Sequence, residues 1–334
     1  MNVMKESQKI AVIGSGSWAT AIAKMLLLNI NQINWYIRNA ASIEYMQQFH
    51  HNPKYLSSVS FDTGRIKFYN DLEKVIMESD ILIFAIPSAF LKGMLSDLKI
   101  DLNDKLVVSA IKGIIPENNQ TIAEYFNQHY NVPFDRIGII TGPCHAEEVA
   151  LERLSYLTIA SKTEEQAKKL ASLLESYFIR TVITSDIYGT EYAAVLKNIF
   201  AIASGICHGL GYGDNFQAVL ISNAISEINR FLDHSYPSQR AINSSAYLGD
   251  LLVTAYSQFS RNRAFGVMIG KGYSVRSAML DMNMIAEGYY ATRCIKEINK
   301  KHNVNLPITE TVYNILYEGI SPAIEIKLLT QQLT

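Results

Sequence analysis

The sequence lacks a surplus of charge, a long hydrophobic run and paired cysteines. Its 334 residues carry 30 Lys and Arg against 31 Asp and Glu, a formal net charge of −1. General polyanion binders carry a basic surplus, so this balance argues against a nucleic-acid partner. Cys144, Cys207 and Cys294 are widely spaced and odd in number. They form neither a disulfide framework nor a zinc motif, so we expect a reducing cytosol and no metal site.

Targeting and membrane signals are also missing. Residues 1–9 are polar and lack the apolar core of a signal peptide. The most hydrophobic early run, residues 81–91, is interrupted by Pro87 and falls short of the ~20 residues that span a bilayer. We therefore expect a soluble, cytoplasmic protein without membrane insertion, and the length suggests two domains of about 150 residues each.

The first half alternates short β-rich runs with helical stretches. Most of the runs are almost continuously apolar, as in strands buried on both faces of a parallel sheet. The alternation predicts a doubly wound, mostly parallel α/β domain over residues 1–188. The predicted strands are Lys9–Ile13, Ile33–Arg38, Ile81–Ile86, Lys105–Ala110, Ile137–Thr141, Tyr156–Ser161 and Phe178–Thr184, and the predicted helices between them include Trp18–Asn29 and Thr163–Ser176.

After about residue 186 the strand pattern stops and apolar residues recur at helical spacing. The sequence therefore predicts an all-α domain over residues 189–334. The predicted helices are Glu191–Ile206, Phe216–Leu232, Ser244–Gln258, Ser274–Leu280, Ile285–Asn299 and Thr309–Leu316.

A glycine-rich turn follows the first predicted strand. Gly14-Ser15-Gly16-Ser17-Trp18-Ala19 fits the G-x-G-x-x-G/A pattern in a strand–turn–helix context, which is typical of dinucleotide binding. Gly14 permits the tight turn, Gly16 lets the backbone approach a pyrophosphate, and the small Ala19 allows the helix to pack on the sheet. The alternative is a tight turn that requires glycine and binds nothing.

The acidic residue that usually follows about 20 positions later is absent, because residues 30–42 contain no Asp or Glu. The second strand ends instead at Arg38, whose guanidinium can pair with a ribose 2′-phosphate. The sequence thus predicts NADP(H) as the preferred cofactor, with NAD(H) also accepted. The alternative is an exposed arginine at a strand end.

Two charges stand alone in apolar sequence of the second half. Lys197 lies in AAVLKNIFAIASGI and Asp250 in AYLGDLLVTAYS. Burying an unpaired charge is costly, so the two are natural partners, and desolvation would lower the lysine pKa toward a range useful for proton transfer. Thr254 lies four residues after Asp250, on the same face of a helix. A purely structural ion pair is the alternative.

Two further cations suit an anionic substrate. Ser260, Arg261 and Asn262 combine a guanidinium with hydroxyl and amide donors, a set that suits a phosphate or a carboxylate. A solvated turn is the alternative interpretation of this short motif. Lys112 lies two residues after a predicted strand, at the edge where open α/β sheets place ligands.

Together these motifs closely resemble the bacterial NAD(P)H-dependent glycerol-3-phosphate dehydrogenases, and the match covers nearly the whole chain. The resemblance implies a Rossmann domain, an all-helical domain and a cleft between them. It also implies reversible reduction of dihydroxyacetone phosphate to sn-glycerol 3-phosphate, which supplies phospholipid synthesis, in a cytoplasmic and often dimeric enzyme. The segments that carry it are GSGSWATAIA, NPKYL, IPSAF, SAIKGI, GPCHAEEV, VLKNIFAIASGI, LGDLLVTAYSQFSRNRAFG, AEGY and LPITETVYNIL.

The resemblance also assigns roles to individual residues. Lys197 matches the catalytic acid/base, and Lys112, Asp250 and Thr254 match its neighbours. The matched substrate contacts are Lys112, Gly142, Cys144, Lys197, Asp250, Ser260, Arg261 and Asn262. The matched cofactor contacts are Gly14, Gly16, Ser17, Trp18, Arg38, Lys112, Ala146, Arg261, Ile285 and Glu287.

This chain departs from the family pattern at three positions. Ala19 stands where the family commonly has Gly, a tolerated change. Cys144 replaces a Ser or Thr, so that a thiol stands where the family has a hydroxyl, and His145 replaces a common Phe.

Other functions remain open on the residues alone. A related dehydrogenase of hydroxy or keto acids would use Arg261 for a carboxylate. A non-catalytic NADP(H) sensor would need the glycine turn but not the Lys197 and Asp250 pair. A methyltransferase would leave everything beyond the glycine turn unexplained.

Overall fold

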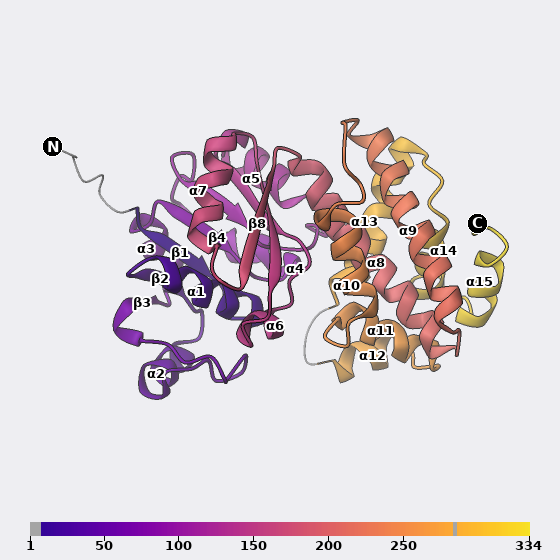
Figure 1. Cartoon of the computed structure of the whole chain (residues 1–334), viewed down its shortest axis with the longest axis horizontal. Coiled ribbons are helices and arrows are strands. Elements are labelled where there is room, and N and C mark those ends of the chain that lie inside the picture. The colour runs from indigo at the N-terminus through magenta and orange to yellow at the C-terminus, as the bar shows by residue number, and fades with distance from the viewer. Residues whose placement is uncertain (1–7, 283–285) are drawn as a thin grey trace. The chain divides into compact units, whose positions relative to one another are not determined.

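The structure is a computed structural model that describes residues 8–282 and 286–334. The chain divides into two compact units, with the main division between Ile187 and Tyr188. Two short segments of the first half, Pro87–Ala89 and Lys112–Thr121, belong to the second unit. Figure 1 shows strands and helices in the indigo-to-magenta first half and only helices in the orange-to-yellow second half. That residues 1–188 and 189–334 fold as separate domains stays a prediction.

The first unit contains one eight-stranded sheet with the strand order β3-β2-β1-β4-β5-β6-β7-β8. Neighbouring strands are parallel except for the antiparallel pair β6 and β7. The strands are β1 (Ile10–Ile13), β2 (Ile33–Tyr36), β3 (Ile66–Tyr69), β4 (Ile81–Phe84), β5 (Leu106–Ser109), β6 (Ile137–Thr141), β7 (Ser155–Ser161) and β8 (Ile179–Thr184).

Both faces of the sheet are buried, which explains the continuous apolar runs. On β4, Ile83 belongs to the same buried cluster as the inner residues of α1 and α7. The next residue, Phe84, points to the opposite face and packs on Phe126 of α5, with ring centroids 4.9 Å apart. The helices of this half are α1 (Ser17–Asn29), α2 (Ala40–Phe49), α3 (Leu72–Met77), α4 (Ser88–Leu95), α5 (Ile122–Tyr130), α6 (Ala146–Ala150) and α7 (Glu164–Leu174).

The second unit is helical and is built around α8, whose residues from Thr190 to Cys207 are all buried. A helix that is apolar on almost every side must lie inside a core, and the few polar residues of α8 are buried with it. Its helices are α8 (Ile187–Gly209), α9 (Asp214–Ser235), α10 (Asp250–Tyr256), α11 (Arg261–Gly270), α12 (Val275–Asp281), α13 (Glu287–His302), α14 (Pro307–Leu316) and α15 (Pro322–Leu329), with a π-helical turn at Ser245–Gly249.

Glycines let α8 and α11 cross with their backbones in contact. A Cβ atom on Gly205 of α8 would lie 2.1 Å from the carbonyl oxygen of Arg263, and one on Gly266 of α11 would lie 2.1 Å from that of Ile202. Neither position can hold a side chain without separating the helices. This contact fixes where α11 begins relative to Lys197.

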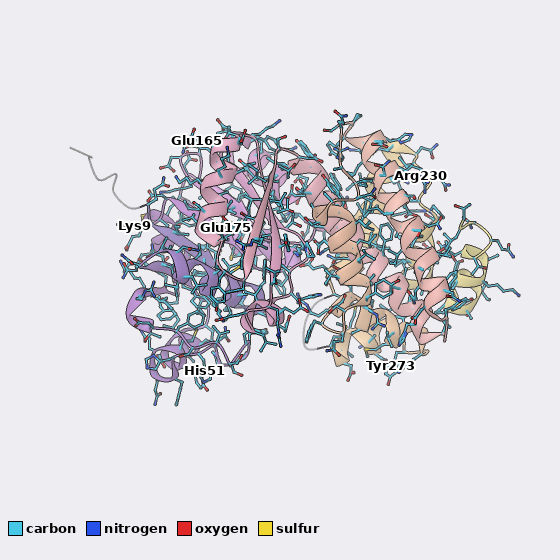
Figure 2. All side chains as sticks on the ribbon, viewed as in Figure 1. Lys9, His51, Glu165, Glu175, Arg230 and Tyr273 are labelled. Carbon is cyan, nitrogen blue, oxygen red and sulfur yellow. The ribbon has the colours of Figure 1, made fainter. Side chains whose placement is uncertain are left out.

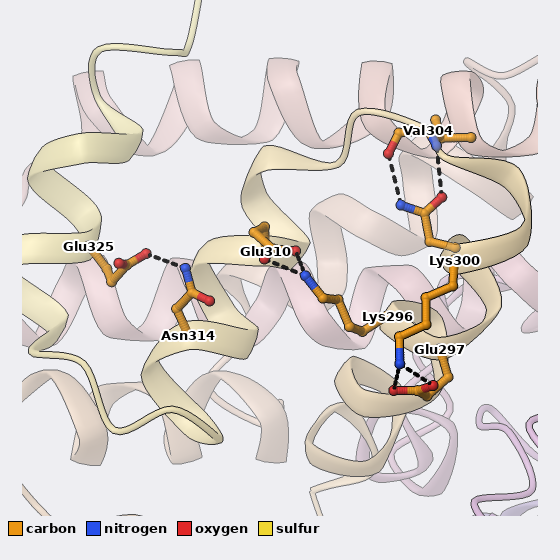
Figure 3. Close-up of polar contacts among 8 residues, drawn as sticks. Lys296, Glu297, Lys300, Val304, Glu310, Asn314 and Glu325 are labelled. Atoms are coloured by element: carbon orange, nitrogen blue, oxygen red, sulfur yellow. Dashed lines mark hydrogen bonds and ion pairs between the residues drawn. The ribbon is translucent and has the colours of Figure 1, made fainter.

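The outer helices are joined by polar contacts, which Figure 3 shows. Lys296 of α13 pairs with Glu310 of α14, and Asn314 of α14 donates to Glu325 of α15 at 3.1 Å. Many other charged residues are exposed, as Glu165 is at the start of α7 (Figure 2). In the described ranges, no helix combines the length and apolar composition that a bilayer span requires.

The predicted fold class is confirmed, and the predicted strands agree with the observed ones to within two residues. The prediction missed β3, because exposed Lys67 and half-buried Phe68 interrupt its apolar pattern. It also missed α11 and α15. The alternative interpretation of Ser260–Gly266 as a solvated turn is wrong, because Ser260 caps α11 and the following residues are helical.

Candidate functional site

Lys197, Asp250 and Lys112 come together within the helical unit. The Lys197 ammonium on α8 lies 2.5 Å from Oδ1 of Asp250, and the other carboxylate oxygen, Oδ2, lies 3.6 Å from the Lys112 ammonium. The Lys197 and Asp250 side chains are 4 % and 1 % exposed, whereas Lys112 is 20 % exposed. One carboxylate is therefore shared by two lysines, of which only Lys112 reaches solvent.

This arrangement tunes the acidity of Lys197. Burial disfavours the charged form and is the main reason why the Lys197 pKa falls to about 7. The negative charge of Asp250 opposes the fall, and the positive charge of Lys112 adds to it. A lysine with a pKa near neutrality can both donate and accept a proton under physiological conditions.

Thr254 lies one turn after Asp250 on α10, as its spacing predicts. Its hydroxyl donates to the backbone carbonyl of Asp250 at 2.6 Å. The Thr254 side chain thus contacts the backbone of the first turn of α10, where Asp250 lies. Its direct part in catalysis stays a prediction.

A chain of side-chain amides links Lys112 to α11 and α13. Asn198 donates to the Lys112 carbonyl at 2.7 Å and accepts from the side chain of Asn262 at 2.9 Å. Asn262 in turn accepts from the backbone N–H of Gly288 at 2.9 Å. Sequence reasoning missed Asn198, although the signal was available, because it too is a polar residue in the apolar run around Lys197.

Glu287, a predicted cofactor contact, holds the segment that begins α4. Its carboxylate accepts from the backbone N–H of Ser88 at 2.8 Å and from the Ser88 hydroxyl at 2.5 Å. Burial raises the pKa of Glu287, while the Ser88 hydrogen bonds and the charge of Arg261 counteract that rise. Ser88 is a second residue that the sequence did not single out. Ile285 lies outside the described residues.

Arg261 is the first residue of α11, and its side chain is exposed. The Ser260 hydroxyl accepts from the backbone N–H of Arg263 at 3.3 Å and so caps this helix. Asn262 is buried and takes part in the amide chain. The predicted phosphate-binding trio thus occupies a helix N-terminus, where backbone N–H groups and the helix dipole favour anions.

The glycine turn lies in the other unit, between β1 and α1. Gly14 has a φ of +129°, and a Cβ atom there would lie 2.4 Å from the Ala85 carbonyl oxygen. Gly16 has an ordinary φ of −74°, and a Cβ atom there would meet no protein atom within 4 Å. The fold requires glycine at Gly14 but not at Gly16, so the missing side chain of Gly16 leaves room for a ligand. The residues present therefore fit a dinucleotide pyrophosphate.

The other predicted cofactor contacts of this unit lie near strand ends. Ser17 and Trp18 form the first turn of α1, and Arg38 is exposed just after β2. Ala146 is the buried first residue of α6. Each therefore follows the carboxyl end of a strand of the sheet, which agrees with its predicted role.

Two predicted substrate contacts follow β6. Gly142 has a φ of +105°, and a Cβ atom there would lie 2.9 Å from the Tyr156 carbonyl oxygen. Cys144 is 7 % exposed. Within residues 8–282 and 286–334, no group of His, Cys, Asp and Glu side chains could hold a metal ion.

Comparisons with known proteins agree with this chemistry. Family models described as NAD-dependent glycerol-3-phosphate dehydrogenase match residues 9–167 (N-terminus) and 186–327 (C-terminus). A glycerol-3-phosphate dehydrogenase (NAD(P)+) of Exiguobacterium sp. is 34% identical over 97% of this chain and 95% of its own length. One of Bacillus subtilis is 34% identical over 93% of this chain and 91% of its own.

Solved structures show the same similarity. The crystal structure of glycerol-3-phosphate dehydrogenase from Coxiella burnetii has a TM-score of 0.89 at 28% identity and covers 97% of this chain and 99% of its own. A D-mandelate dehydrogenase structure, at 18% identity and a TM-score of 0.58, shares the fold alone. The chain belongs to the NAD-dependent glycerol-3-phosphate dehydrogenase family.

Proposed function

We propose that this protein catalyses the reversible, NAD(P)H-dependent reduction of dihydroxyacetone phosphate to sn-glycerol 3-phosphate. The observation that carries the proposal is the buried Lys197–Asp250–Lys112 cluster. A protein that only binds a dinucleotide needs no buried carboxylate shared by two lysines. An enzyme that must protonate a carbonyl oxygen needs a proton donor, and a lysine in such a cluster can be that donor.

The reduction requires a hydride at C2 of the ketone and a proton at its oxygen. The reduced nicotinamide supplies the hydride when it is bound. Lys197 holds the proton on its Nζ atom and donates it to the oxygen that becomes the hydroxyl group. Asp250 keeps the ammonium in place, and Lys112 orients the substrate from the exposed side of the cluster. In the reverse direction Lys197 accepts the proton.

The substrate phosphate is proposed to bind at the start of α11. Arg261 supplies charge there, and Ser260 and Asn262 belong to the same helix start. Gly142 and Cys144 are proposed as further substrate contacts. Holding the phosphate places the carbonyl, so binding energy far from the reacting carbon supports the chemical step.

The cofactor is proposed to bind at the glycine turn through Gly14, Gly16, Ser17 and Trp18, with Arg38 on the 2′-phosphate of NADP(H). Support comes from the space that Gly16 leaves and from the exposure of Arg38. Further proposed contacts, supported by the family resemblance, are Lys112, Ala146, Arg261, Ile285 and Glu287.

The resemblance also supports a cellular role. We propose that the enzyme works in the cytoplasm as a homodimer without nucleic-acid partners, and that its product supplies phospholipid synthesis. The near-zero net charge agrees with a small-molecule substrate rather than a polyanion.

A direct assay tests the function. The purified protein is expected to oxidise NADPH when dihydroxyacetone phosphate is added, and to use NADH less well. Unphosphorylated keto acids should give little turnover, because they lack the group that Arg261 holds. Turnover on keto acids alone would favour the rival dehydrogenase, and NADPH binding without any oxidation would favour the sensor.

Replacing Lys197 tests the proton donor. We expect Lys197→Ala to lower kcat by about a hundredfold to ten-thousandfold, the usual contribution of general acid catalysis. Lys296→Ala is the matched control, since Lys296 is a partly exposed lysine paired with Glu310 in the same unit. That control should keep wild-type kcat. Circular dichroism and NADPH titration would check that both variants fold and bind cofactor, and near-normal kcat in Lys197→Ala would refute the role.

Replacing Arg261 tests the phosphate site. Arg261→Ala should raise KM for dihydroxyacetone phosphate by about tenfold to a hundredfold, as expected for the loss of a charge-assisted hydrogen bond. Arg276→Ala removes an exposed arginine from α12 and serves as the control. An unchanged KM in Arg261→Ala would place the phosphate elsewhere.

A further inference from the structure

Three successive carbonyl oxygens of the glycine turn are each held by a side chain of the same unit. The Trp35 indole N–H donates to the Gly14 carbonyl at 2.7 Å. The Asn52 amide donates to the Ser15 carbonyl at 3.0 Å. The Gly16 carbonyl accepts both from the Thr20 hydroxyl at 2.9 Å and from the Thr20 backbone N–H at 3.0 Å. None of these three side chains was singled out as a site residue from the sequence.

Holding a carbonyl also fixes the N–H of the next residue. In a planar trans peptide the C=O and N–H bonds point in opposite directions, and the described residues contain no cis peptide bond. The N–H groups of Ser15, Gly16 and Ser17 therefore point away from the side chains that hold the carbonyls. The free N–H groups at the start of a helix form a binding surface for anions such as phosphate.

Asn52 is the centre of this arrangement. It is 2 % exposed, and its Nδ2 group donates both to the Ser15 carbonyl and to the Thr20 hydroxyl, the latter at 2.9 Å. Its Oδ1 atom accepts from the backbone N–H groups of Lys54 and Tyr55 at 3.0 and 3.1 Å. All four hydrogen-bonding positions of the amide are thus used.

The segment that carries Asn52 is held against its own backbone preference. Leu56, four residues later, has a φ of +49°, a left-handed conformation that leucine rarely adopts. Such a conformation persists only where surrounding contacts impose it. The hydrogen bonds of Asn52 to the backbone N–H groups of Lys54 and Tyr55 hold the part of this loop just before Leu56.

We propose that Asn52, acting with Thr20, is a positioning residue for the pyrophosphate of the dinucleotide cofactor. Asn52 keeps the Ser15 carbonyl oxygen turned away from the phosphates and so presents the N–H group of Gly16 to them. The Thr20 hydroxyl accepts from Asn52 and helps to hold the Gly16 carbonyl. A released Ser15 peptide could rotate its oxygen toward the anion and repel it. The inference rests on the proposed function only in taking NADP(H) as the ligand.

Asn52→Asp tests the donor of the Asn52 amide independently of its acceptor. The carboxylate keeps the acceptor for Lys54 and Tyr55, but it replaces the Nδ2 donor with an oxygen that repels the Ser15 carbonyl. Asn34→Asp is the matched control. Asn34 is also buried in this unit, and its Nδ2 group donates to a backbone carbonyl, that of Glu78, and to a hydroxyl, that of Ser79.

The expected result is a selective loss of cofactor affinity. Asn52→Asp should raise the Kd for NADPH, measured by cofactor fluorescence, by about tenfold to a hundredfold, the cost of leaving buried polar groups unpaired. KM for NADPH should rise in parallel, while KM for dihydroxyacetone phosphate and kcat at saturating NADPH stay within about twofold. Asn34→Asp should lower the melting temperature without raising that Kd.

Thr20 provides a second pair of variants that does not depend on the folding of Asn52→Asp. Thr20→Val keeps the shape but removes the hydroxyl that accepts from Asn52 and donates to Gly16, so it loosens Asn52 and should weaken NADPH binding several-fold. Thr20→Ser restores the hydroxyl and should recover wild-type affinity. If Thr20 has a purely structural role, Thr20→Val should lower the melting temperature and leave the affinity for NADPH unchanged.

The outcomes distinguish this inference from the proposed function. If the wild-type protein neither binds NADPH nor oxidises it, the proposed function fails. If the wild type binds NADPH and both Asn52→Asp and Thr20→Val bind it equally well, the positioning role is overturned. An equal loss of affinity in Asn52→Asp and Asn34→Asp would also overturn it.

Discussion

The proposed chemistry depends on one electrostatic arrangement, a buried carboxylate shared by a buried lysine and a partly exposed one. Removing an ion from water costs on the order of several kcal/mol, and that cost is offset only if partners are close. Asp250 provides the partner for Lys197 at 2.5 Å and faces Lys112 at 3.6 Å. With both lysines protonated, the cluster keeps one net positive charge. It therefore suits a substrate that brings negative charge to it and develops more on its oxygen during reduction.

The surrounding helices keep this arrangement in place. Contact between the α8 and α11 backbones at Gly205 and Gly266 sets where the two helices cross. The amides of Asn198 and Asn262 then connect the Lys112 backbone to α11 and α13. Residues with different proposed tasks, proton transfer, substrate orientation and phosphate binding, thus share one hydrogen-bonded frame. A displacement of any of these helices should therefore change the surroundings of Lys197.

Sequence reasoning could find the charges but not the neutral groups that position them. Lys197 and Asp250 stood out because a lone charge in apolar sequence demands a partner, and the glycine turn stood out because its spacing is diagnostic. Asn198 gave only a weak signal, as a neutral polar residue in an apolar run. Ser88 and Asn52 act through hydrogen bonds to residues far away in the sequence, and a hydroxyl or an amide in a loop or at a helix start does not by itself require a partner. Likewise β3 was missed because its stability comes from pairing with β2, while its own pattern is interrupted by Lys67.

The most direct test of the central claim is the pH dependence of kcat/KM for dihydroxyacetone phosphate reduction. This ratio reports the pKa of essential groups in the free enzyme. Reduction needs protonated Lys197, so activity should fall as the pH rises through about 7, the pKa of that lysine.

Two variants should shift this fall in activity in opposite directions. Asp250→Asn removes the charge that raises the pKa of Lys197, and should move the fall to lower pH. Lys112→Met removes the charge that lowers it, and should move the fall to higher pH. Shifts in opposite directions would establish that the two neighbours tune Lys197, whereas a fall that stays fixed, or that moves the same way in both variants, would contradict the account.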